Sequence, residues 1–136
     1  MAIGDITAIS GFAEKVYTAY KEAPNEYRHI SEEVRSLQVI IDKALGHFES
    51  DSLRNNDWQE GLEVLNGCQS VLEDLYSLME KYNTLAAANA SQVFEEVKLD
   101  TEDIATLELR LISNTDQLEG FIQRFDILTI TIENLC

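Results

Sequence analysis

The chain is poor in the residues that mark strands, tight turns and cross-links. Its 136 residues include one proline, six glycines and two cysteines. Cys68 and Cys136 have no metal-ligand spacing, and one of them is the last residue, so we expect neither a disulfide framework nor a zinc site. No run of about 18 apolar residues occurs, and no basic segment precedes the first helix-like stretch. A cytoplasmic protein without an ordinary membrane span is therefore expected.

Positive charge is also scarce. Ten lysines and arginines stand against 25 aspartates and glutamates, for a formal net charge of −15. This balance opposes the phosphate neutralisation on which most nucleic-acid affinity depends. It also disfavours binding to anionic lipid through a basic patch. The charge predicts no nucleic-acid partner and favours basic protein partners.

Motifs for catalysis and cofactor binding are absent as well. The sequence has no phosphate-binding glycine loop, and Cys68 has no histidine partner evident from sequence. Glu26 and His29 have the spacing of a di-iron ligand pair, but such a site needs a second pair and none exists. His29 and His47 would lie about 27 Å apart on one helix, and both fall off its apolar stripe. We expect solvent-exposed histidines, no enzyme, no metal, no cofactor and no small-molecule substrate.

What the sequence does have is helical periodicity. Apolar residues recur every three or four positions on both sides of Pro24, which marks a turn between two helices. Asp57 and Glu60 resemble a helix-capping pair, and Thr101 is a suitable cap for the last helix. Gly67 and Cys68 are small residues at which a neighbouring helix can approach closely. The expected helices of a single domain, 1–136, are 4–22, 25–48, 57–85 and 101–128.

Two segments leave alternatives open. The stretch LAAANASQVFEEVKLD, residues 85–100, loses the periodicity and is interpreted as a connection, with room for one short helix after Ser91. The final TITIENLC alternates like a strand, although helix or a fraying helix end is favoured because packing overrides weak local preferences. The resulting fold class is all-α, an antiparallel bundle of four main helices.

Two polar residues interrupt the apolar face of the last expected helix. At about 100° per residue, Thr115 falls in the middle of that face and Asn114 at its edge. One interpretation is local: Thr115 bonds to the carbonyl one turn earlier, and Asn114 reaches nearby backbone. The alternative is a polar layer of Asn114 and Thr115 that fixes helix register, because a wrong register would leave these groups without partners.

Three segments carry a resemblance to a known group: AYKEAPNEYRHISEEVRSLQVII, CQSVLEDLYSLMEKY and TEDIATLELRLISNTDQLEGFIQRF. From about residue 3 to 130, the chain resembles the fungal N-terminal helical domains that precede NACHT or ankyrin modules in NOD-like-receptor-type proteins. The strongest parts are the helix-proline-helix turn at Ala23-Pro24 and the pattern Arg110-Leu111-x-Ser113-Asn114-Thr115-x-x-Leu118-x-x-Phe121. Such domains tend to carry a second arginine where this chain has Glu108, which disfavours anion binding by that face.

The resemblance implies a role as well as a fold. HeLo and HeLo-like domains of this group act in programmed cell death, in which the first helix is thought to be released and to perturb membranes. The matching candidate face for membrane contact or self-association here is formed by Ile3, Ile6, Ile9, Phe12, Ala13 and Val16. The alternative is that this face only packs into its own bundle.

Two functions follow as hypotheses. The first is an N-terminal effector or signalling domain of a fungal immune-type receptor, cytoplasmic and membrane-associated on activation, which acts by self-association. The second is a passive interaction bundle whose acidic surface docks a basic partner. Asp5 and Glu14 make spontaneous membrane insertion costly, so any membrane contact would be conditional on a trigger.

Overall fold

The described part of the chain folds into four α-helices. A computed structural model describes residues 3–49, 55–88 and 101–135. The helices are α1 (Ile3–Lys21), α2 (Asn25–Glu49), α3 (Asn55–Ala88) and α4 (Thr101–Leu135). Within those ranges there is no strand, so the expected all-α bundle of four main helices is confirmed.

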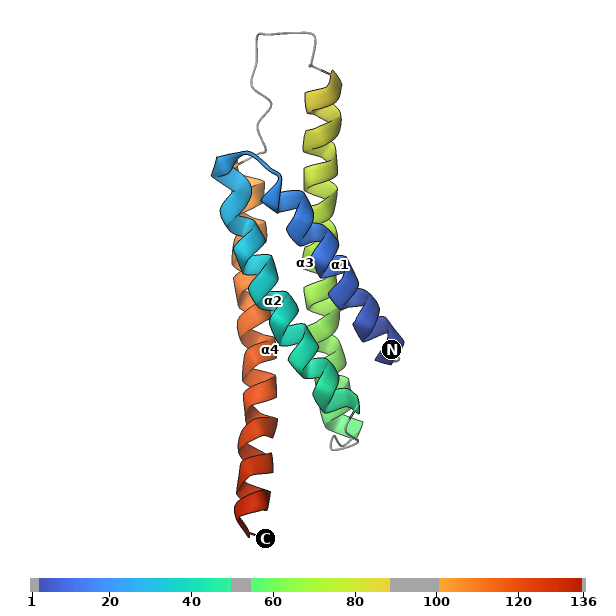
Figure 1. Ribbon diagram of the computed structural model, residues 1–136, viewed down its shortest axis with the longest axis vertical. Helices are drawn as coiled ribbons and strands as arrows, with labels where there is room; N and C mark the ends of the chain where they lie inside the picture. Colours follow the sequence, from blue (N-terminus) through green and yellow to red (C-terminus); the bar gives the residue numbers. More distant parts are fainter. Residues whose placement is uncertain (1–2, 50–54, 89–100, 136) are drawn as a thin grey trace.

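The helices form two antiparallel hairpins that pack against each other (Figure 1). The first hairpin is α1 and α2, and the second is α3 and α4. Across the two hairpins, α2 packs against α4 and α1 packs against α3. These two cross-hairpin pairs each run in the same direction. The α1/α3 seam and the α2/α4 seam therefore lie on opposite sides of the bundle.

The core is built from the periodic apolar residues of all four helices. Tyr20 is the largest fully buried side chain. Burial of many aliphatic side chains in one cluster is the main stabilising contribution expected for such a bundle. The central members of the cluster are Ile6, Val16, Ile30, Val34, Leu37, Ile41, Leu65, Leu72, Leu75, Leu111 and Leu118.

The turn between α1 and α2 follows the chemistry of Pro24. The Ala23 amide donates to the Tyr20 carbonyl at 3.2 Å, which closes α1. The Tyr27 amide donates to the Pro24 carbonyl at 2.9 Å, so proline stands immediately before the first turn of α2. Arg28 also donates to the Ala23 carbonyl at 3.3 Å. Proline suits this position because its fixed φ fits a helix start.

The ends of the two long helices differ from the sequence expectation. α3 begins at Asn55 rather than Asp57 and continues to Ala88 rather than 85. Asparagine is itself a good residue at a helix start, so two more residues join the helix. α4 continues to Leu135 rather than 128 and includes most of TITIENLC as helix, since β-branched residues lower helix propensity only slightly. The short helix considered after Ser91 lies outside the described residues.

Candidate functional site

The candidate membrane face of α1 lies against the rest of the bundle. Ile6, Ala13 and Val16 have no exposed surface, and Ile9 is 3% exposed. Phe12 is partly buried and meets the ring of Tyr76 edge-on, with centroids 5.5 Å apart. The side chain of Ile3 lies outside the described residues. The apolar surface proposed for a membrane is therefore also the surface that holds α1 in the fold.

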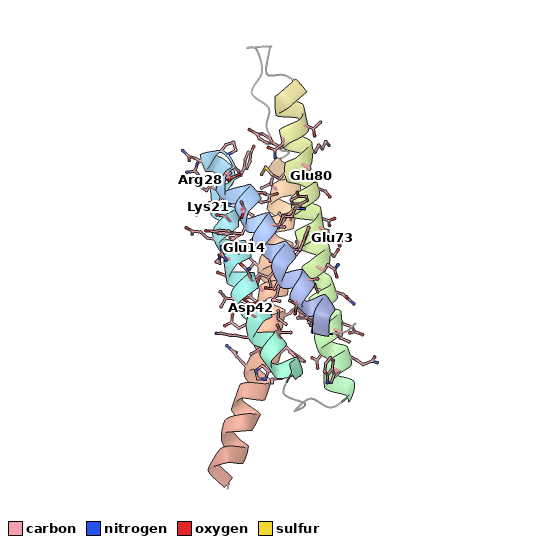
Figure 2. All side chains as sticks on the ribbon, turned by 45° about the vertical axis from the view of Figure 1, so that its right-hand side comes forward. Glu14, Lys21, Arg28, Asp42, Glu73 and Glu80 are labelled. Atoms are coloured by element: carbon pink, nitrogen blue, oxygen red, sulfur yellow. The ribbon has the colours of Figure 1, made fainter. Side chains whose placement is uncertain are left out.

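Polar contacts between α1 and α2 lie at the surface. Ser10 donates to the Asp42 carboxylate at 2.6 Å, and Arg35 donates to Glu14 at 2.7 Å. The Arg35 guanidinium also lies 3.8 Å from the ring centroid of Tyr17. The hydrogen bond from Arg35 lowers the pKa of Glu14. Figure 2 labels Glu14 and Asp42 on the two helices. Because solvent screens exposed pairs, these contacts add little stability each.

One buried hydrogen bond joins α1 to α3. The Tyr20 hydroxyl donates to the Leu75 carbonyl at 2.7 Å. Burial raises the pKa of Tyr20, so the phenol stays protonated and remains a donor. Detaching α1 would break this bond and expose the ring.

No described helix has both the length and the apolar character needed to cross a membrane. α1 is amphipathic instead: its apolar side faces the core, and Glu14, Lys15 and Thr18 lie on its exposed polar side. An amphipathic helix can lie in a membrane interface without spanning it.

Asn114 and Thr115 of α4 form hydrogen bonds within their own helix. The Thr115 hydroxyl donates to the Leu111 carbonyl at 2.7 Å, and the Asn114 amide donates to the Arg110 carbonyl at 2.8 Å. These are the local bonds of the first interpretation. A role for Asn114 and Thr115 in helix register stays a prediction.

Asn114 also lies where α3 and α4 approach closely. A Cβ atom added at Gly67 would stand 2.6 Å from the Asn114 Oδ1 atom, which is too close for two nonbonded atoms. Beside it, the Cys68 thiol lies 3.9 Å from the Asn114 carbonyl oxygen. Burial raises the pKa of Cys68 to about 12, so the thiol is protonated and unreactive. The sequence indicated both small residues and Asn114, but not that they meet.

A cluster of titratable groups lies between α2 and α4. His29 and Glu108 are joined by Nε2 and Oε2 atoms 2.7 Å apart. The neighbouring Glu33 has one buried carboxylate oxygen without a hydrogen-bond partner in the described part of the chain. Burial, followed by repulsion from Glu108, raises the pKa of Glu33. Sequence reasoning missed this cluster because Glu108 is 79 residues from His29.

The two histidines differ in exposure. The His29 side chain is 52% exposed, as expected, whereas His47 is only partly exposed. Among the described residues, no three acidic, histidine or cysteine side chains are arranged to hold a metal ion.

Comparisons with protein-family models, curated proteins and solved structures found no match to this chain. The likeness to HeLo-like domains therefore rests on the sequence patterns themselves. The function must be argued from the contacts of α1 and the surfaces of the bundle.

Proposed function

We propose that this bundle is an effector or signalling domain of the HeLo-like kind, at the N-terminus of a fungal intracellular immune-type receptor. In the resting state α1 belongs to the bundle. On activation, copies self-associate and α1 leaves the core to contact a membrane, in the course of programmed cell death.

The observation that carries this proposal is that α1 makes buried apolar contacts and mostly exposed polar ones. Its apolar face is buried, while the hydrogen bond of Ser10 with Asp42 and the ion pair of Glu14 with Arg35 are exposed and weak. The buried polar tie is the hydrogen bond from Tyr20 to Leu75. A helix held mainly by a nondirectional apolar face can transfer that face to another apolar environment.

The energetic scale explains why a trigger is needed. Exposing Ile6, Ile9 and Val16 to water would cost about 1.5–3 kcal/mol each, or about 5–9 kcal/mol together. That sum is comparable with the whole stability of an ordinary domain, about 5–15 kcal/mol. Release into water would therefore be rare. A bilayer or further copies of the chain must cover the face.

A reversible lock between α1 and α2 tests this proposal. Ser10 and Asp42 are in side-chain contact, so Ser10→Cys/Asp42→Cys offers a disulfide across the two helices. The protein, fused to an oligomerising tag, would be added to dye-filled liposomes. Leakage should be blocked when the disulfide is formed and restored by reductant. Each single cysteine variant is the matched control.

The membrane proposal fails if leakage is equal with and without the lock, or if the tagged unlocked protein causes none. A formed disulfide should be verified by mass before each assay. The buried Cys68 thiol is protected from exchange.

The passive interaction bundle is the second candidate because α3 presents an acidic outer side. Glu73 and Glu80, two turns apart, are exposed along one side of this helix (Figure 2), and Glu63 is also exposed. These carboxylates suit a basic partner. This function predicts no leakage under any condition, and deletion of residues 1–20 would then merely unfold the domain.

A further inference from the structure

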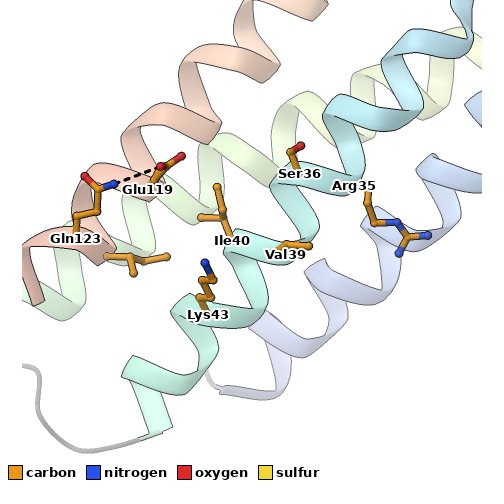
Figure 3. A pocket seen from close by; sticks show the side chains of 8 residues that line it. Arg35, Ser36, Val39, Ile40, Lys43, Glu119 and Gln123 are labelled. Atoms are coloured by element: carbon orange, nitrogen blue, oxygen red, sulfur yellow. Dashed lines mark hydrogen bonds between the residues drawn. The ribbon is translucent and has the colours of Figure 1, made fainter. Parts of the chain in front are cut away.

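A groove runs between α2 and α4, on the side of the bundle opposite the α1/α3 seam (Figure 3). Its volume is about 510 Å³. Val39 and Ile40 of α2 and Ile122 of α4 provide its apolar surface. The rim carries Lys43 on one helix and Glu119 on the other. Glu119 accepts a hydrogen bond from Gln123 at 3.2 Å, so this rim is an ordered polar edge.

Exposed apolar side chains of α2 and α4 lie on and next to this groove. Val39 is 47% exposed, Ile112 is 41% exposed and Leu109 is 69% exposed. Ile112 precedes Glu119 by seven residues, which is two helical turns, so both lie on the same side of α4. Leu109 lies one turn before Ile112. Large aliphatic side chains this exposed, next to a groove, are typical of an interaction surface rather than of scattered surface residues.

The spacing of these side chains fits a helical partner. His29 of α2 contacts Glu108 of α4, and the two helices run in the same direction. Val39, ten residues after His29, therefore lies beside residue 118, ten residues after Glu108. Ile112 then lies six residues earlier, about 9 Å along the seam. Two apolar residues about two turns apart on one face of a helix could contact Ile112 and Val39 together.

The charges around the groove determine which charge its partner should carry. Glu119 lines the groove, and helical spacing sets two more exposed carboxylates beside it, since Glu32 lies two turns before Val39 and Asp116 lies two turns before Gln123. Two cations also line the groove, Arg35 and Lys43, and Arg35 is already paired with Glu14, which leaves Lys43 to face these carboxylates. A second copy of this chain would bring another formal charge of −15 to an acidic seam. Charge complementarity therefore disfavours a second copy and favours a basic segment.

We propose that the α2/α4 groove docks a basic amphipathic helix of a partner protein. Its apolar residues pack on Ile112, Val39 and Ile40, and its lysines or arginines face Asp116 and Glu119. α1 does not line this groove. This docking therefore does not depend on release of α1, and the two proposals can fail separately.

The test uses the full chain and an 18-residue leucine–lysine peptide with leucines every three or four positions. Amide chemical shifts of the isotope-labelled protein should change along α2 and α4. A peptide with glutamate in place of lysine should not bind. Ile112→Ser should weaken binding at least tenfold, because it removes an anchor at an exposed site and leaves the core unchanged. Leu109→Ser should weaken it less, since Leu109 lies farther from the groove.

A matched pair of charge reversals separates docking from general attraction to an acidic protein. Glu119→Lys should weaken peptide binding at least tenfold, whereas Glu73→Lys, the same change on the outer side of α3, should weaken it less than threefold. Equal effects of the two variants would overturn the proposal. So would shift changes centred on α3, or a concentration-dependent dimer lost in Ile112→Ser, which would make a second copy the occupant.

Discussion

The two hairpins of the bundle are held together by different means. In the first, α1 meets α2 through an apolar face and through exposed polar contacts such as Arg35 with Glu14. In the second, α3 and α4 approach closely where Asn114 lies over Gly67. Two ion pairs also bridge α3 and α4, Arg110 with Asp74 and Arg124 with Glu60. The ion pairs of both hairpins are exposed and add little stability, so the close contact at Gly67 is what distinguishes the second hairpin. Under the proposed function, α1 is the element that leaves the bundle.

Truncating one buried side chain in each hairpin should give the largest effects and should distinguish the two hairpins. Ile9→Ala and Leu111→Ala each remove a buried aliphatic side chain, and each should cost about 2–5 kcal/mol of unfolding free energy. Hydrogen exchange should separate them. Ile9→Ala should speed exchange mainly in α1, whereas Leu111→Ala should speed it in all four helices. Identical exchange patterns would mean that α1 is not a separate unit.

The close approach of α3 and α4 can be tested at Gly67. Gly67→Ala places a methyl group against the Asn114 side chain and should destabilise the fold by about 1–3 kcal/mol, despite the better helix propensity of alanine. In an Asn114→Ala background the same change should be neutral or stabilising. A double-mutant cycle by denaturant unfolding measures the coupling. Additive effects would show that the contact does not limit the packing of the two helices.

The buried tie of α1 to α3 should have a smaller effect. Tyr20→Phe removes the hydroxyl that donates to the Leu75 carbonyl and should cost about 1 kcal/mol. If α1 is the detachable element, this variant should also increase leakage in the liposome assay. The control is Tyr76→Phe on α3, which keeps the ring that meets Phe12 and should leave both measurements unchanged.

The pH dependence of Glu33 should give the smallest effect. Because the folded-state pKa of this acid is raised, its contribution to stability is present when it is protonated and is lost as the pH rises through that pKa. Glu33→Gln should therefore stabilise the fold at pH 7, by at most about 1 kcal/mol because the side chain is partly solvated. The gain should vanish near pH 4. Glu32→Gln, an exposed neighbour, is the control, and an equal gain from it would contradict the assignment.

Much of the architecture could be predicted from periodicity. The buried stripe from Ile6 to Val16 and the start of α4 at Thr101 follow from local patterns and capping chemistry. The favoured interpretation of TITIENLC as helix is confirmed as far as Leu135, but the expected boundary at 128 was too early because β-branched residues weaken the local preference for helix. Helix ends depend on small energy differences of this kind.

The sequence by itself determined the helical class, the apolar faces, the acidic charge and the small residues at which helices can approach. Each of these properties depends on residues close together in the chain, within a few turns of one helix. Only the tertiary structure decided that α2 lies beside α4, that Asn114 meets Gly67 and that His29 pairs with Glu108. The physical reason is that amphipathic stripes specify which face is buried but not which helix covers it, because the hydrophobic effect is nondirectional.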